Sequence, residues 1–156
     1  MNPLTDRIRE WLVRELGGEP QQWEGETILH NRIEGERGDK WNQAVVVREQ
    51  HRQVAIYAYL PRQCPKNRFR EMLVALNRLN YRMVCGCFEM DMDDGEVSFR
   101  HGFDFMKVVD DTGDVLDALF SVAYFTASAE MDRWMKALEG VMDGGDPTAL
   151  VAEGFE

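Results

Sequence analysis

The chain has 156 residues, of which 44% are hydrophobic and 29% are charged, and this composition is typical of one soluble domain with a substantial core. Its formal net charge of -10 argues against binding to nucleic acids or anionic membranes, because phosphate groups attract basic surfaces. The sequence has no apolar run that would span a membrane, and charges near its start argue against a signal peptide. A cytoplasmic protein is therefore expected.

The three cysteines, Cys64, Cys85 and Cys87, are an odd number and do not form a disulfide framework. Two of them are separated by one residue, and a tetrahedral metal site would need a second ligand pair, so small buried or interface residues are expected. The acidic segment from Asp91 to Gly95 departs from a calcium loop, because glycine is its fifth residue and not its sixth. A solvated hairpin tip is expected there, with no metal and no cofactor.

In chain order, the first predicted element is a helix that begins at Pro3, with Asn2 as its N-cap, and ends before Gly17. Large apolar residues repeat along it at helical spacing. Residues 26 to 34 form a short apolar and β-branched run, which predicts a strand, and residues 35 to 39 indicate a turn.

Residues 41 to 60 predict a β-hairpin. Folding at Gln50 and His51, or across a four-residue loop with the same register, places the apolar residues of both strands on one face. The predicted pairs on this face are Val47 with Val54, Val45 with Ile56 and Trp41 with Leu60, and those on the other face are Ala44 with Tyr57, Asn42 with Tyr59 and Arg48 with Gln53.

After Pro61 ends the hairpin, a second helix is predicted from Pro65. Its apolar residues recur every three or four positions, as expected for a helix that packs on a sheet. This stripe consists of Phe69, Met72, Leu73, Leu76 and Leu79.

Residues 81 to 105 predict a second hairpin, because alternation, turn chemistry and charge pairing agree. A two-residue turn at Asp94-Gly95 pairs one face as Met92 with Val97, Met90 with Phe99, Phe88 with His101, Gly86 with Phe103 and Val84 with Phe105. On the other face it pairs Glu89 with Arg100 and Asp91 with Ser98. The ring of Phe103 is expected to cover Gly86.

A long helix is predicted from about Gly113 to Gly140, with a buried face formed by Leu116, Phe120, Ala123, Ala127, Met131, Trp134 and Leu138. Its first half is apolar on nearly every side, so it should be covered twice or shared with another subunit. Residues 1–142 are expected to form a single domain. Residues 143–156 are expected to be a loosely ordered tail, with a short turn or helix after Pro147.

The predicted order α-β-β-β-α-β-β-α indicates an α+β fold of two layers, with helices against an antiparallel sheet. The segment from Leu76 to Phe105 resembles the YbjN-type bacterial domain family, whose members share the type III secretion chaperone-like architecture. The matching positions are Asn80, Gly86, Phe88, Asp91, the Asp94-Gly95 turn and Arg100. They are packing and turn positions, and the element order extends the resemblance over residues 3 to 140.

The resemblance implies a cytosolic homodimer that binds other proteins or acts in regulation. In the secretion chaperones the middle helix and the strand after it form the dimer contact. By position that strand is Arg82 to Asp91, and its outer residues, Met83, Cys85 and Cys87, are the expected dimer interface. Tyr57 and Tyr59 are the expected partner-binding residues, because aromatic side chains supply contact area at interfaces.

The sequence thus predicts a non-catalytic protein-binding domain, a chaperone-like or regulatory adaptor, that adds a partner strand to a sheet edge or docks an amphipathic helix. The alternative is a small-molecule-binding regulatory domain with a pocket between the last helix and the sheet. Catalysis would require His101 or His30 to converge with carboxylates in one cleft. The common nucleophile, phosphate-binding and dinucleotide-binding motifs do not occur, and no enzyme activity is expected.

Overall fold

The computed structural model describes residues 3–22, 27–108 and 113–156. The helices are α1 (Pro3–Leu16), α2 (Phe69–Arg82), α3 (Asp114–Met142) and α4 (Pro147–Glu153), and short 3-10 turns occupy Glu49–His51 and Lys66–Arg68. The strands are β1 (Ile28–Glu34), β2 (Lys40–Arg48), β3 (Gln53–Tyr59), β4 (Cys87–Met90) and β5 (Val97–Asp104). The predicted α+β class and the predicted element order through α3 are confirmed.

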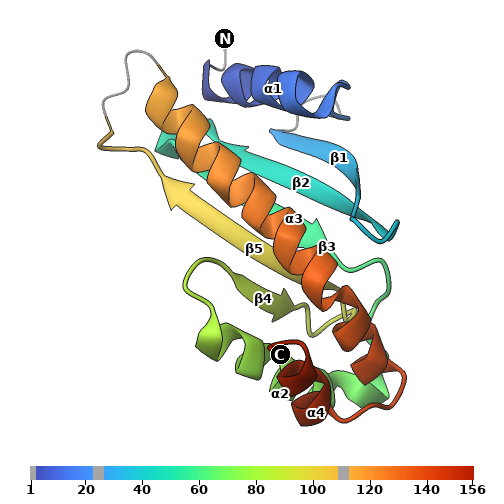
Figure 1. Cartoon of the computed structure of the whole chain (residues 1–156). Helices are drawn as coiled ribbons and strands as arrows, with labels where there is room; N and C mark the ends of the chain where they lie inside the picture. The colour runs from blue at the N-terminus through green and yellow to red at the C-terminus, as the bar shows by residue number, and fades with distance from the viewer. Residues whose placement is uncertain (1–2, 23–26, 109–112) are drawn as a thin grey trace.

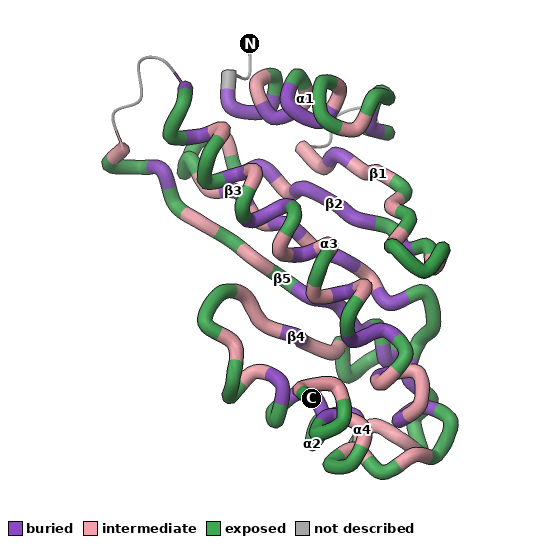
Figure 2. The backbone as a smooth tube through the Cα atoms, viewed as in Figure 1, coloured by how far each residue is buried: buried purple, intermediate pink, exposed green. Residues whose placement is uncertain are grey.

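The five strands form one antiparallel sheet in the order β1-β2-β3-β5-β4. Figure 1 shows α3 crossing one face of this sheet, and of the described helices none crosses the opposite face. On the covered face the amide of Gln43 donates a hydrogen bond of 3.0 Å to the carbonyl of Tyr124 in α3. Figure 2 shows the buried positions concentrated on β2, β3 and the side of α3 that faces them.

Helix α1 packs beside α3 through Trp11, whose ring centroid lies 4.7 Å from that of Phe120. Its C-terminus is set by Gly17, which has a φ of 77° and ends the helix where the sequence predicts. The predicted N-cap, Asn2, lies outside the described residues.

The buried face of α3 contains all seven residues that its helical spacing predicts: Leu116, Phe120, Ala123, Ala127, Met131, Trp134 and Leu138. The first half of the helix also keeps large apolar side chains in solvent, of which Val122 is 64% exposed. The others are Val115, Leu119 and Phe125. The sheet and α1 therefore cover only part of this apolar circumference.

The β2–β3 hairpin has the predicted register, with Val45 opposite Ile56 and Ala44 opposite Tyr57. The strands are joined by the four residues 49–52, and Arg52 takes a left-handed conformation with a φ of 49°. The predicted pair of Trp41 with Leu60 lies beyond the end of the ladder, because β3 ends at Tyr59.

The β4–β5 hairpin differs from its predicted register by two residues. Phe88 lies opposite Phe99, Met90 opposite Val97 and Cys87 opposite Arg100. The predicted two-residue turn is wrong, because Asp91 pairs its backbone with Glu96 and encloses a four-residue loop. A shift of two residues keeps each side chain on its predicted face, so Phe88, Val97 and Phe99 are still buried.

The start of this hairpin is also corrected. Gly86 has a φ of 76°, which breaks the strand, and β4 begins only at Cys87. Val84, predicted to face Phe105, is 97% exposed. A Cβ at Gly86 would overlap the ring of Phe99, so the aromatic cover comes from Phe99 and not from Phe103.

Helix α2 buries Met72, Leu76 and Leu79 as predicted, but Leu73 is 43% exposed. Residues 143–156, expected to be a loose tail, contain α4, which begins after Asp146 as its N-cap. Val151 of α4 is buried, and the ring of Phe155 lies 4.7 Å from that of Trp134. The tail is therefore packed against α2 and α3 through apolar side chains.

Candidate protein-binding surfaces

The uncovered face of the sheet carries a pair of aromatic rings. Tyr57 and Tyr59 point to the same side of β3, because residues two apart on a strand share a face. Their ring centroids are 5.9 Å apart and their planes differ by 10°, so the rings are stacked. Both side chains are half-buried, which leaves an aromatic surface in contact with solvent.

One cation lies beside this pair. Arg100 of β5 is directly opposite Tyr57, and its Nε is 3.1 Å from Oε2 of Glu89. The carboxylate of Glu89 is the chief cause of the raised pKa of Arg100. Burial is the main cause that raises the pKa of Tyr59 to about 12, so this phenol stays neutral and can donate a hydrogen bond to a partner.

The residues predicted from the sequence do not all come together. Cys85, Cys87 and Tyr57 line one open hollow of about 800 Å³ on the uncovered face. Met83 follows the end of α2 and packs against the core. The strand from which these three were inferred begins only at Cys87, so Met83 and Cys85 belong to the connection that precedes it.

The two edges of the sheet differ in their free backbone groups. On β4, the side chain of Asn80 accepts a 2.7 Å hydrogen bond from the N–H of Phe88 and donates one of 2.8 Å to its carbonyl. On β1, His30 exchanges both backbone hydrogen bonds with Gln21. Backbone groups alternate in direction along an antiparallel strand, so those of Arg32 and Glu34 point outward too. The β1 edge is therefore the better site for strand addition.

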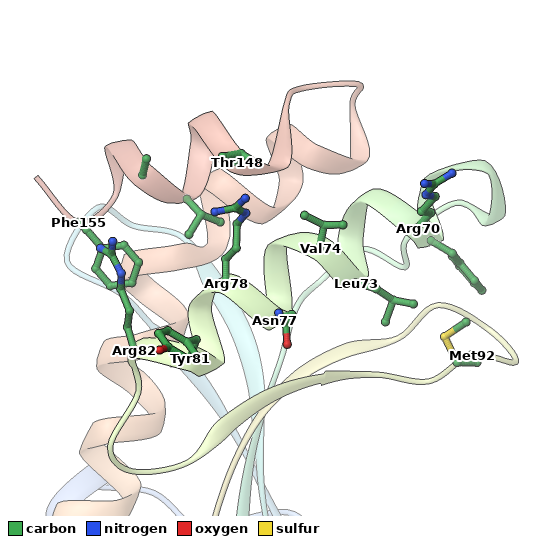
Figure 3. Close-up of a pocket in the computed structure, with 13 residues that line it drawn as sticks. Arg70, Leu73, Val74, Asn77, Arg78, Tyr81, Arg82, Met92, Thr148 and Phe155 are labelled. Carbon is green, nitrogen blue, oxygen red and sulfur yellow. The ribbon is translucent and has the colours of Figure 1, made fainter.

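A second hollow lies between α2 and α4 (Figure 3) and has a volume of about 890 Å³. Its apolar lining includes Leu73, Val74 and Tyr81, all exposed, and Phe155 lies at the end near Arg82. This groove was not predicted from the sequence. The sequence did carry a signal for it, because residues four apart share one helix face. Two adjacent rows of this kind run along α2, one at positions 69, 73, 77 and 81 and the other at positions 70, 74, 78 and 82.

The space between α3 and the sheet, where a small-molecule pocket was the alternative, is filled by buried side chains that include Trp41, Ile56, Phe120 and Tyr124. The described hollows lie elsewhere and open to solvent. This geometry favours the protein-binding interpretation over the closed-pocket alternative.

The histidines do not converge. His101 lies opposite Ile56 on the covered face, and His30 lies opposite Ala44 on the uncovered face. Burial lowers the pKa of His101. Within the described ranges, no cluster of three or more His, Cys, Asp or Glu side chains could hold a metal ion, and none of the described helices is long and apolar enough to cross a membrane.

No protein-family model matches this sequence, and a search of curated proteins finds no significant match. The fold is nevertheless similar to those of solved structures. YbjN from E. coli, described as a putative transcription regulator, aligns with a TM-score of 0.58 and 12% identity over 83% of this chain and 89% of its own.

Two similar structures are protein complexes. A chain of the ExsC-ExsE complex aligns with a TM-score of 0.55 and 14% identity over 86% of this chain and 96% of its own. A chain of the HopA1-SchA chaperone-effector complex aligns with a TM-score of 0.54 and 9% identity over 86% and 95%. The fold is thus the YbjN and type III secretion chaperone-like α+β fold, as the sequence resemblance predicts.

Proposed function

We propose that this chain is a non-catalytic protein-binding domain, a chaperone-like or regulatory adaptor that acts in the cytoplasm. The stacked Tyr57 and Tyr59 on an uncovered sheet face carry this proposal. Rigid aromatic rings give a partner large contact area at little conformational cost. The similarity to a chain of a chaperone-effector complex supports the same class of function.

In this proposal an extended segment of the partner pairs with the free part of the β1 edge, and partner side chains cover the tyrosine pair. The net charge of -10 favours basic or neutral partners and discourages acidic ones at long range. The ion pair of Arg100 with Glu89 sets the polar part of the contact.

The test is affinity capture of the tagged protein from its native cytosol, followed by mass spectrometry. We expect one stoichiometric protein partner, and we expect the double variant Tyr57→Ala with Tyr59→Ala to retain about tenfold less of it. Met106→Ala, at an exposed apolar side chain elsewhere, should retain it fully. Recovery of a metabolite with no protein partner would contradict the proposal.

We further propose a homodimer whose contact includes the connection from Met83 to Cys87. Cys85 is exposed in this connection, and its replacement tests the contact without disturbing the core. Cys85→Glu should convert a dimer to a monomer in sedimentation velocity, because it places a charge in a desolvated interface. A variant that still sediments as a dimer would move the interface elsewhere.

A further inference from the structure

The groove between α2 and α4 differs in charge from the rest of the molecule. The chain has 28 acidic and 18 basic side chains, apart from histidine. Among the groove's lining residues there are three arginines, Arg70, Arg78 and Arg82, and no aspartate or glutamate. An acidic protein thus carries one apolar groove whose charged side chains are all basic.

The charges of these arginines are available to a ligand. All three side chains are exposed, and none forms an ion pair within the part of the chain that the structure describes. Arg82 lies over the ring of Phe155, at 4.4 Å from its centroid, which fixes the end of the groove. Figure 3 shows Arg70 at the opposite end, near Met92 of the β4–β5 loop.

The lining of α2 consists of two adjacent rows of side chains. The first row holds Phe69, Leu73, Asn77 and Tyr81, and the second holds Arg70, Val74, Arg78 and Arg82. Each row extends over about 18 Å, since a helix rises 1.5 Å per residue. A ligand that matches both rows needs an apolar stripe beside an anionic stripe over three to four helical turns.

The geometry favours a helix as the ligand. The groove is lined by two helices, whose backbone groups bond within each helix, so it has no free strand edge for an extended peptide. An amphipathic helix presents residues four apart on one face, which is the spacing of the α2 rows. Apolar side chains would cover Leu73 and Tyr81, and carboxylates would reach Arg70 and Arg78.

A second copy of this chain is a poorer ligand for the groove. A two-fold contact places the same patch of both copies together. It would bring two sets of these arginines into one interface, and the lining has no carboxylate to separate them. Like charges that meet in an interface oppose association.

We propose that the groove between α2 and α4 docks an acidic amphipathic helix of a partner protein. This goes beyond the proposed function, because it assigns a second binding site that shares no residue with the tyrosine pair or the β1 edge. The overall negative charge slows the long-range approach of an acidic partner but does not prevent docking in the groove. The charged residues that line the groove are all arginines, and at physiological salt exposed charges farther away than about 8 Å are largely screened.

The test uses synthetic helical peptides about four turns long, with leucine in one row and glutamate in the next, labelled for fluorescence anisotropy. A matched peptide carries lysine in place of each glutamate. We expect the glutamate peptide to bind at least about tenfold more tightly, because its carboxylates pair with the exposed arginines whereas lysine in their place is repelled. The difference should shrink as salt rises.

Charge-reversal variants of the protein provide the second part of this test. The double variant Arg70→Glu with Arg78→Glu should no longer bind the glutamate peptide and should bind the lysine peptide instead. The control Lys107→Glu, an exposed change elsewhere, should keep the preference for the glutamate peptide. Circular dichroism of the variants checks that the fold is intact. Amide shifts in NMR on adding the glutamate peptide should concentrate on α2 and α4.

Equal binding of the two peptides, or no binding of either, would overturn the proposal. So would a dimer that Leu73→Asp converts to a monomer, because the groove would then be a contact between copies. The variant with Tyr57→Ala and Tyr59→Ala should bind the glutamate peptide normally. Failure at the sheet face is therefore distinguishable from failure at the groove.

Discussion

The two hairpin loops hold distant segments of the chain by different chemistry. In the β2–β3 loop, the carboxylate of Glu49 accepts hydrogen bonds from the N–H groups of Leu4 and Thr5 at 2.8 and 3.1 Å, in the first turn of α1. In the β4–β5 loop, the backbone carbonyl of Gly95 accepts one of 2.8 Å from the N–H of Cys64. A side-chain anchor tolerates partial replacement, whereas a backbone anchor depends on one conformation of the loop.

The largest expected effect is at the backbone anchor. Gly95 and Gly38 have nearly equal φ angles of 82° and 83°. A Cβ at Gly95 would overlap the carbonyl of Cys64, whereas a Cβ at Gly38 would have no neighbour within 4 Å. Gly38→Ala should lose about 1 kcal/mol of unfolding free energy from backbone strain alone. Gly95→Ala should lose about 3 kcal/mol or more, because the loop must also move. Urea unfolding measures both, and equal losses would contradict the docking of this loop.

The next largest effect is expected at Asn80, whose side chain bonds the backbone of Phe88 on the outer edge of the β4–β5 hairpin. Asn80→Ala removes both partners of the backbone of Phe88 and should cost about 2 kcal/mol of unfolding free energy. Asn77→Ala, one turn earlier on the exposed side of α2, should change the stability by less than about 0.5 kcal/mol. Similar losses in the two variants would mean that water replaces Asn80 without cost.

The side-chain anchor should give a smaller, graded effect. Glu49→Ala leaves two N–H groups of α1 without their carboxylate and should cost about 1 to 2 kcal/mol of unfolding free energy. Glu49→Gln, which keeps one acceptor, should lose about half of that. The exposed Glu10→Ala on α1 is the matched control. A glutamine variant as unstable as the alanine variant would count against a graded anchor.

The smallest expected effect is the pH dependence of stability that arises from His101 in β5. Burial holds the folded pKa of His101 below its ordinary 6.5, so the unfolded chain binds a proton more readily than the folded one. Stability should therefore fall as pH drops below about 6.5. His101→Gln should reduce this fall in thermal unfolding between pH 7 and pH 5. An unchanged slope in the His101 variant would contradict this assignment.

The hairpins also show what periodicity could predict. Both have the predicted faces, because alternation fixes which side chains share a face. The register of the β2–β3 hairpin follows from its two apolar rows. The Asp94-Gly95 dipeptide suggested a tight turn, but Gly95 instead ends a four-residue loop. The carbonyl of Gly95 accepts a hydrogen bond from Cys64, which precedes it by 31 residues in the sequence. A local turn signal carries no information about such a distant contact.

Of the two candidate surfaces, the tyrosine pair was predicted from the sequence and the groove between α2 and α4 was not, for the same reason. The tyrosine pair follows from strand alternation alone, and the structure shows the two rings stacked. The α2 groove depends on α4, whose packing against α2 brings Phe155 to Arg82. Sequence spacing displays the two rows of α2, but it does not show which second element turns them into a groove.

The hydrogen bonds of Asn80 have a consequence for the size of assemblies. A carboxamide offers the same donor and acceptor as a peptide group, so Asn80 takes the place that a sixth strand would occupy beside Phe88. Strand addition beside Phe88 is therefore disfavoured, and the β1 edge is the better site for it. A partner strand added at β1 would leave the far edge blocked beside Phe88, so copies cannot stack end to end through that position. This single side chain favours small, closed complexes over open-ended fibres.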